Sequence, residues 1–307
     1  MLTIGKLTPG RADYYCEQLP GGRDEYYTGG GEEPGVWLGA AAGRLDLEGI
    51  VDATQFRRVL EARHPWTDEP LGIPATTASR LAGLDLCFSA PKSVSVAWAL
   101  APPELSDRIA AAHDRAVVDA VGALELEAVR ARRGAGGQHT VETDGVVAAG
   151  FAHRTSRAGD PQLHTHVVMA NLTPDRTGRW SALDGAQIYR WAKTTGYLYQ
   201  AALRHHVTTD LGFEWGPVHK GAADLAGIDD AVLDQFSKRT AQIEHALDGR
   251  AGHVPLAVAK TATLTTRPSK ADLPDQSVLR QQWVAEASEV GFGADRMVAL
   301  AGRQPHP

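Results

Sequence analysis

The chain has 307 residues, 43% of them hydrophobic, which is enough for one large domain or two ordinary domains with a sizeable core. This composition excludes disorder of the whole chain, and no apolar run reaches the roughly 18 residues that a membrane-spanning helix needs. With two cysteines, Cys16 and Cys87, a disulfide framework and a cysteine-rich zinc module are excluded, and without an apolar leader we expect a cytoplasmic protein.

The formal net charge of −6 comes from one acidic segment. Residues 17–52 contain eight acidic residues against two arginines, so the rest of the chain is neutral on balance. Within that rest, residues 130–157 contain five arginines against two acidic residues, which permits a basic surface strip. The acidic net charge therefore does not exclude a nucleic-acid partner.

The N-terminal part predicts a loop and then a short helix. Residues 16–49 are rich in glycine, proline and acidic residues, which predicts a flexible segment with little regular structure. Asp52 stands three residues before Gln55 and is placed to begin a helix over TQFRRVLEAR that ends before Pro65.

Residues 83–88, GLDLCF, predict a strand with two different faces. Asp85 and Cys87 share one face, and the apolar side chains of the run share the other. A helix over SAPKSVSVAWAL is expected next, with Ser89 and Pro91 at its start. Apolar residues at helical spacing then predict a long helix over 103–133.

The remainder of the chain predicts a β-hairpin followed by helices. The strand-like runs 146–155 and 162–173 are joined by the polar connection SRAGDP. The elements expected after the hairpin are a helix from Asp184 to about Asp210, a strand at LGFEW, a helix capped by Asp229 that runs through QFSKRTAQIEHAL, and short helices over 254–303. A few strands followed by helices indicate an α+β fold, an antiparallel sheet flanked by helices.

Three histidines of the predicted hairpin form a candidate metal site. His164 and His166 lie two residues apart on one strand and therefore share a face, and His153 on the partner strand can lie across from them. Three neutral imidazoles with open coordination positions suit a divalent ion that acts as a Lewis acid better than a structural zinc. Hydrogen-bonded surface histidines remain the alternative.

One carboxylate and four tyrosines complete the candidate site. Asp85 lies within an apolar strand and needs a partner, so it either orients a metal-bound imidazole, accepts a proton from a nucleophile, or makes a structural hydrogen bond. The tyrosines form two doublets, Tyr14-Tyr15 and Tyr26-Tyr27. A phenol becomes a nucleophile when a metal, base or cation stabilises its phenolate, whereas packing is the common role of aromatic doublets.

Several motifs together, in this order along the chain, resemble the relaxase domain of MobF-type conjugative relaxases, which are HUH endonucleases. They are the two tyrosine doublets, GLDLCFSAPKSVS, HRTSRAGDPQLHTHVVMANLT and QFSKRT. The resemblance covers roughly residues 1–290 and implies one relaxase domain, an HUH palm with a C-terminal helical lid, in which 16–49 is flexible. Residues 291–307 are then a tail or the start of a downstream region, and no phosphate-loop motif of a helicase occurs.

The resemblance implies site- and strand-specific nicking and rejoining of DNA at the transfer origin of a conjugative plasmid or integrative element. Tyr14 is implied to be the first nucleophile, which forms a 5′-phosphotyrosyl intermediate, and Tyr26 a second one, although Tyr27 is hard to distinguish from it. Asp85 is the implied acidic partner. His153, His164 and His166 are implied to hold the divalent ion, Mg²⁺ or Mn²⁺, with Zn²⁺ or another divalent ion as alternatives.

The implied substrate is single-stranded DNA next to a hairpin. Candidate phosphate contacts are Arg157, Lys92, Lys238 and Arg239, and ordinary solvated charge is the alternative for each. Trp180 and Trp191 are candidates for base stacking, with burial in the core as the alternative. Relaxosome accessory proteins and a coupling protein are implied partners of a monomeric enzyme that stays in the bacterial cytoplasm or passes to the recipient cell bound to DNA.

Three other functions compete with this interpretation. A rolling-circle replication initiator shares the HUH metal site and the tyrosine chemistry. A metal-dependent hydrolase would use water as the nucleophile and form no covalent protein adduct. A DNA-binding module with a vestigial metal site would bind hairpin DNA without cutting it.

Overall fold

The structure is a computed structural model that describes residues 1–8, 15, 33–72, 81–134, 137–247 and 274–302, with the side chains of 243–247 left aside. The described chain divides into two compact units. The first contains residues 1–89, 114–153 and 164–203, and the second contains residues 90–113, 154–163 and 204–307. Four of the five boundaries between the units fall inside elements, and the fifth follows residue 89. The four elements are α4 (Pro103–Ala128), β6 (Ala148–Thr155), β7 (Pro161–Ala170) and α5 (Gly185–Leu211).

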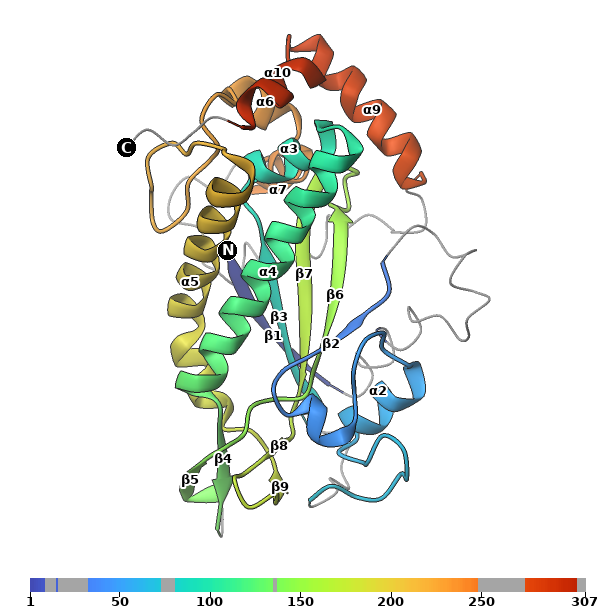
Figure 1. Cartoon of the computed structure of the whole chain (residues 1–307), viewed down its shortest axis with the longest axis vertical. Helices are drawn as coiled ribbons and strands as arrows, with labels where there is room; N and C mark the ends of the chain where they lie inside the picture. The colour runs from blue at the N-terminus through green and yellow to red at the C-terminus, as the bar shows by residue number, and fades with distance from the viewer. Residues whose placement is uncertain (9–14, 16–32, 73–80, 135–136, 248–273, 303–307) are drawn as a thin grey trace. The chain divides into compact units, whose positions relative to one another are not determined.

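A five-stranded sheet with the strand order β1-β3-β7-β6-β2 organises the fold (Figure 1). The remaining strands of this sheet are β1 (Leu2–Leu7), β2 (Val36–Leu38) and β3 (Gly83–Ser89). β1 and β7 each pair antiparallel with β3, and β2 pairs antiparallel with β6. Two small antiparallel ladders join β4 (Arg130–Arg133) to β5 (His139–Glu142) and β8 (Thr173–Pro174) to β9 (Trp180–Ser181). The predicted combination of an antiparallel sheet with helices is therefore found.

The two faces of β3 are different, as its alternating sequence predicts. Leu84, Leu86 and Phe88 are almost completely buried, and the ring of Phe88 lies 5.4 Å from the ring of Tyr199 in α5. The other face carries Asp85 and the side chains around it, which are partly exposed. The sheet therefore offers one face to the hydrophobic core and polar groups on the other.

A hydrophobic cluster lies beside these polar groups in the first unit. Its aromatic members pack edge to face: the ring of Phe56 is 5.5 Å from that of Phe151 and 6.1 Å from that of Trp37. Phe56 belongs to α2 (Ala53–Leu60), whose apolar face contributes to the cluster. Burial of these large rings provides much of the driving force that holds α2 against the sheet.

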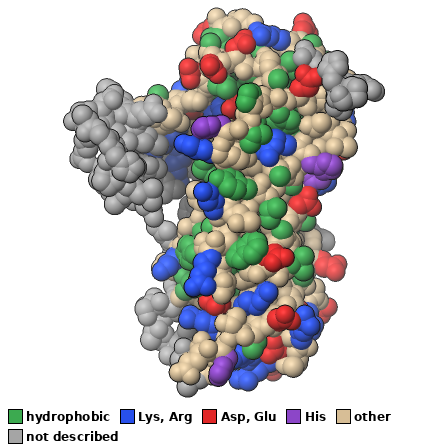
Figure 2. Space-filling model, turned by 90° about the vertical axis from the view of Figure 1, so that its left-hand side faces the viewer, with side chains coloured by type: hydrophobic (Ala, Val, Ile, Leu, Met, Phe, Trp, Pro, Cys, Tyr) green, Lys and Arg blue, Asp and Glu red, His purple; other side chains and the backbone are tan. Residues whose placement is uncertain are grey.

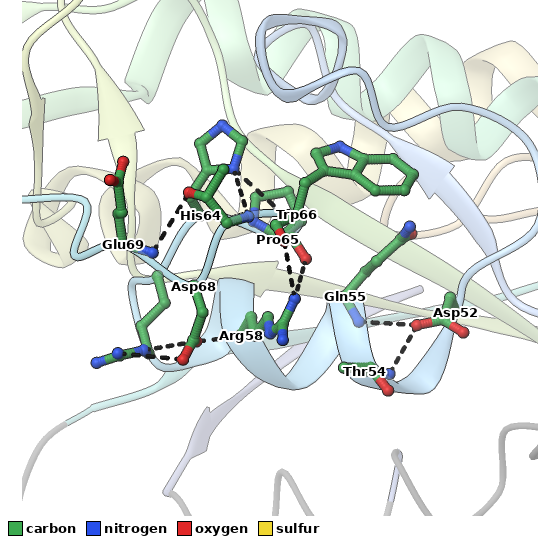
Figure 3. Close-up of polar contacts among 11 residues, drawn as sticks. Asp52, Thr54, Gln55, Arg58, His64, Pro65, Trp66, Asp68 and Glu69 are labelled. Atoms are coloured by element: carbon green, nitrogen blue, oxygen red, sulfur yellow. Dashed lines mark hydrogen bonds and ion pairs between the residues drawn. The ribbon is translucent and has the colours of Figure 1, made fainter.

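Asp52 caps α2, as predicted. Its Oδ1 accepts hydrogen bonds from the backbone N–H groups of Thr54 and Gln55, both at 2.9 Å (Figure 3). The helix ends at Leu60, five residues before Pro65, because the chain turns there and Arg58 donates a hydrogen bond to the carbonyl of Pro65 at 2.9 Å. An aspartate at this position satisfies N–H groups that the first helical turn leaves without partners.

The segment 16–49, predicted to have little regular structure, contains two short elements in its second half. Residues 36–38 form β2 and residues 42–45 form the short 3-10 helix η2 (Ala42–Leu45), while 16–32 lie outside the described residues. Trp37 is buried opposite Ala149 of β6, so burial of one aromatic residue fixes this short strand at the sheet edge. Gly39 has a φ of 93°, and a Cβ there would lie 2.2 Å from the carbonyl oxygen of Val146.

Two predicted helix boundaries also differ from the structure. Ser89 is the last residue of β3 opposite His164, and α3 (Lys92–Leu100) begins after Pro91 without a side-chain cap. The long helix α4 ends at Ala128 instead of continuing to 133. Residues 130–133 form β4 because β5 supplies backbone partners and Ala131 becomes completely buried.

The C-terminal half contains the remaining differences. The expected strand at LGFEW is a single bridge between Trp215 and Leu225. The helix expected after Asp229 is interrupted, because Phe236 is buried and the Ser237 hydroxyl donates to the carbonyl of Leu233 at 2.7 Å. The resulting helices, followed by the last two of the described chain, are α6 (Asp230–Gln235), α7 (Lys238–Leu247), α9 (Gln276–Glu289) and α10 (Ala294–Leu300).

Asp229 does not cap α6 with its side chain, which pairs instead with Arg296 at 2.8 Å. Helix α9, with 14 residues, is longer than the short helices expected from 254 onward. That these C-terminal helices act as a lid stays a prediction. Among the described residues, no helix combines the length and the apolar character that crossing a membrane requires.

Candidate metal centre

Three imidazoles of the β6–β7 hairpin meet on the polar face of the sheet. The ring of His153 in β6 lies 5.1 Å from the ring of His164 and 5.1 Å from that of His166, both in β7, and the last two rings are 5.4 Å apart. One ligand atom from each residue lies within 4.8 Å of the others. The period of two along β7 places His164 and His166 on one face, and the neighbouring strand brings His153 to them.

The donor set of these three residues fits a divalent metal ion. Three nitrogen donors on rigid strands can occupy one side of a cation and leave other positions for oxygen ligands. His153 is 9% exposed and the other two are partly exposed, so the described residues cover the cluster only in part. We therefore assign the cluster as a candidate centre for a divalent ion that can also bind a second molecule.

Asp85 is a direct partner of one of these imidazoles. Its Oδ1 lies 2.8 Å from Nδ1 of His166, across β3 and β7. An imidazole that donates its Nδ1–H to a carboxylate presents Nε2 to a metal ion. Of the roles that the sequence left open for Asp85, the contact corresponds to orienting a histidine.

The environment of His166 strongly favours its protonated form when no metal is bound. Burial alone would lower the pKa of this imidazole, but hydrogen bonds with Asp85 and Cys87 and the charges of the same two groups raise the pKa to about 10. Cys87 lies directly opposite His166 in the ladder of β3 and β7. A metal ion at this ring must therefore compete with a proton.

Tyr15 reaches the same carboxylate from a different part of the chain. Its hydroxyl donates to Asp85 Oδ2 at 2.8 Å and lies 3.2 Å from His166 Nδ1. The side chain is 6% exposed, and its ring lies 5.3 Å from the ring of Phe151. The sequence signal for this contact is the tyrosine doublet that contains Tyr15, but the doublet does not indicate the partner.

The two proposed nucleophiles, Tyr14 and Tyr26, lie outside the described residues, as does Tyr27. Their roles stay predictions.

Three of the four predicted phosphate-binding cations lie around one buried carboxylate in the second unit. Asp160 is completely buried in the hairpin connection, and its Oδ2 accepts from the backbone N–H of Arg239 at 3.3 Å. Lys238 lies 3.8 Å from Asp160 Oδ1 and pairs with Glu286 at 2.8 Å. The ammonium group of Lys92 donates to the carbonyl of Pro161 at 3.0 Å.

Burial governs the titration of this group of residues. It raises the pKa of Asp160, although the charges of Lys92 and Lys238 act in the opposite direction, and it lowers the pKa of Lys92. The charges of Lys92 and Lys238 and the backbone N–H of Arg239 thus stabilise a buried carboxylate, and no motif in the sequence singles out Asp160. Arg157 lies partly buried in the same connection. Phosphate binding by these four cations stays a prediction.

The arginines of residues 130–157, whose number permits a basic surface strip, are not all free at the surface. Arg154 is 8% exposed, and Arg133 forms an ion pair with Asp175. On the face shown in Figure 2, basic and acidic side chains are interspersed. The two candidate stacking residues differ as well, because Trp180 packs against the hydrophobic cluster of the first unit whereas Trp191 is partly exposed.

The chain is similar to known conjugation proteins over almost its whole length. Residues 9–290 match the family described as TrwC relaxase. The chain is 33% identical over 324 residues to the multifunctional conjugation protein TraI of Escherichia coli, and 34% identical over 314 residues to TraI of strain K12. These matches cover 99% and 96% of the chain, which spans 17% of the length of each of these relatives.

Solved structures agree with the family match. A metal-bound conjugative relaxase TrwC in complex with oriT DNA has a TM-score of 0.83 at 33% identity, with 96% of this chain and 100% of that chain covered. TrwC with a 27-mer DNA that comprises the recognition hairpin and the cleavage site has a TM-score of 0.80 at 32% identity over the same shares. The α+β class with an antiparallel sheet, predicted from the sequence, is confirmed by these neighbours.

Proposed function

The chain belongs to the TrwC relaxase family, and from this premise we propose that it nicks and rejoins one DNA strand at the transfer origin of a conjugative plasmid or integrative element. The observation that carries the proposal is the histidine triad of the β6–β7 hairpin with Asp85 as its partner. It occurs in a chain whose structural neighbours are relaxases in complex with oriT DNA. We take residues 1–290 as the catalytic domain.

His153, His164 and His166 would hold the divalent ion. When bound, a divalent ion there supplies Lewis-acid stabilisation of the negative charge on a phosphate group. We propose Mg²⁺ or Mn²⁺ as the physiological ion, while Zn²⁺ and other divalent ions also accept imidazole nitrogen. Asp85 holds the ring of His166 in the orientation that ligation requires.

Tyr14 is the proposed first nucleophile. Its phenol oxygen forms a bond to the scissile phosphorus, the phenol proton leaves, and the 3′ oxygen departs and takes up a proton. The products are a free 3′-hydroxyl and a 5′-phosphotyrosyl protein. One phosphodiester replaces another, so the strand can be rejoined without ATP. Tyr26 is proposed to serve a second strand transfer.

The proposed substrate is single-stranded DNA next to a hairpin. Arg157, Lys92, Lys238 and Arg239 are proposed phosphate contacts, although Lys92 and Lys238 would have to loosen their present contacts with Pro161 and Glu286. We further propose a cytoplasmic monomer that works with relaxosome accessory proteins and a coupling protein and enters the recipient cell bound to DNA.

The test uses a single-stranded oligonucleotide from the cognate transfer origin, labelled at its 3′ end. The label then stays on the fragment that becomes attached to the protein through its 5′ phosphate. The protein is incubated with and without Mg²⁺ or Mn²⁺ and separated on a denaturing gel. We expect a metal-dependent labelled protein band that Tyr14→Phe abolishes, whereas Tyr26→Phe, the matched control, retains the first adduct.

Other outcomes would overturn the proposal. Metal-dependent cleavage that survives Tyr14→Phe without an adduct would identify a hydrolase that uses water. Binding of hairpin DNA without cleavage would identify a DNA-binding module. If the adduct forms but the gene supports plasmid replication and not plasmid transfer, the protein is a replication initiator.

A further inference from the structure

We propose that Tyr15 is a positioning residue, which acts through Asp85 to hold His166 in its metal-ligating orientation. The second tyrosine of the first doublet then has a task different from the nucleophilic role proposed for Tyr14. This inference depends on the metal centre of the proposed function but not on DNA cleavage, so the two can fail separately.

The hydrogen bonds around Asp85 support this role. Tyr15 has one hydroxyl proton, and it points to Oδ2 of Asp85 at 2.8 Å. Oδ1 of the same carboxylate lies 2.8 Å from Nδ1 of His166. Two donors, one on each oxygen, fix the plane of the carboxylate and the tautomer of the ring. When a cation binds, His166 would keep its proton on Nδ1 and offer Nε2 as the ligand.

Asp85 therefore links Tyr15 to the metal ligand, because its two oxygens accept hydrogen bonds from Tyr15 and from His166.

The position of Tyr15 is rigid enough for this task. Its side chain is 6% exposed, and its ring packs 5.3 Å from that of Phe151, which in turn packs 5.5 Å from Phe56. The ring is part of the hydrophobic cluster, so packing already fixes the direction of its hydroxyl group. A buried phenol held in this way is suited to orienting a neighbour.

The first experiment measures Mn²⁺ binding by calorimetry in the absence of DNA. Tyr15→Phe removes only the hydroxyl and keeps the packed ring. We expect the Mn²⁺ affinity to fall by about tenfold, the lower end of the range typical of groups that orient a metal ligand. Tyr199→Phe is the matched control, because Tyr199 is completely buried on the other face of the sheet. It removes the same atom but should leave the Mn²⁺ affinity unchanged.

The second experiment asks whether Tyr15 acts through Asp85. In an Asp85→Asn background, Tyr15→Phe should change the Mn²⁺ affinity by less than about twofold, because the link to His166 is already altered. Equal losses in both backgrounds would overturn the proposal. So would a Tyr15→Phe protein that unfolds more easily but binds Mn²⁺ as the unmodified chain does, since that result describes a purely structural tyrosine.

A third measurement needs no substitution. Nitrogen NMR of the histidine rings in the Zn²⁺-loaded protein should show His166 protonated at Nδ1. Protonation at Nε2 would overturn the proposal, because Nδ1–H could then not donate to Asp85, whatever the variants show.

Discussion

Asp85 and His166 are separated by 81 positions in the sequence, yet their side chains meet at 2.8 Å. The contact is diagonal in the sheet, because Asp85 pairs with Val168 and His166 pairs with Cys87. Neighbours of this kind on one face of an antiparallel pair lie within reach of long side chains. The register of β3 against β7 therefore determines which carboxylate orients the ring.

Replacement of Asp85 by asparagine should weaken divalent metal binding. The amide cannot supply a charged acceptor to Nδ1–H, and loss of such a partner typically costs about 10–100-fold in metal affinity. Calorimetric titration with Mn²⁺ measures the change. Asp52→Asn is the control, because it makes the same chemical change at a helix cap remote from the triad in sequence and retains a capping group. An unchanged affinity in Asp85→Asn would show that the contact has no role in ligation.

His164→Ala should reduce the Mn²⁺ affinity more than Asp85→Asn does, because it removes one of three candidate donor atoms rather than a group behind one. The same titration measures it. His205→Ala is the matched control, since His205 is an exposed histidine of α5 outside the triad. Equal binding by the His164 and His205 variants would exclude the triad as the metal centre.

The cap of α2 predicts a stability change that is independent of the metal. Asp52→Ala leaves the N–H groups of Thr54 and Gln55 without their acceptor and should lower the free energy of unfolding by about 1 kcal/mol. Urea denaturation measures the difference. Asp52→Asn should remain within a few tenths of a kcal/mol of the unmodified chain, and an equal loss in both variants would assign the effect to charge instead.

Glu125 of α4 predicts a dependence of stability on pH. Its Oε1 accepts from the backbone N–H groups of Ala40 and Val146, each at 2.8 Å. Burial raises its pKa above the ordinary 4.5, although both hydrogen bonds act in the opposite direction. The contribution of this group to stability is therefore fully present below pH 4.5 and is lost as the pH rises through the raised pKa.

Glu125→Gln keeps an acceptor oxygen and removes the charge. We expect the free energy of unfolding of this variant, relative to that of the unmodified chain, to be higher at pH 7 than at pH 4.5. Urea denaturation at both pH values measures it. Glu125→Ala should instead lose about 1–3 kcal/mol at both values, because it leaves the N–H group of the buried Val146 without its acceptor. A Gln variant whose stability relative to the unmodified chain is equal at both values would contradict the raised pKa.

Much of the fold follows from local patterns in the sequence. The alternation in β3, the hairpin and the cap at Asp52 are each specified by residues a few positions apart, and they were predicted. The sequence also predicts that the three histidines meet, because they lie on one hairpin. By contrast, β2 depends on burial of Trp37 against β6, more than 100 residues later, and the interruption after α6 depends on burial of Phe236.

The same distinction applies to the candidate site. The need of Asp85 for a partner was visible in its apolar strand, but the identity of that partner was not. Tyr15 reaches Asp85 across 70 positions, and nothing in the spacing of a tyrosine doublet shows which member turns toward the sheet. The sequence does not reveal Asp160 for a similar reason, since its partners Lys238 and Arg239 lie more than 75 residues away in the chain.

The short strand β2 also affects how copies of this chain behave next to one another. An open sheet edge exposes backbone groups that a strand of a second molecule can pair with, which promotes aggregation. Here the outer side of β2 is used internally, because Trp37 donates to the carbonyl of Gly49 at 2.9 Å and Val51 donates to that of Gly35 at 2.8 Å. These hydrogen bonds protect this edge of the sheet from strand addition by a second molecule, which favours colloidal stability at high concentration.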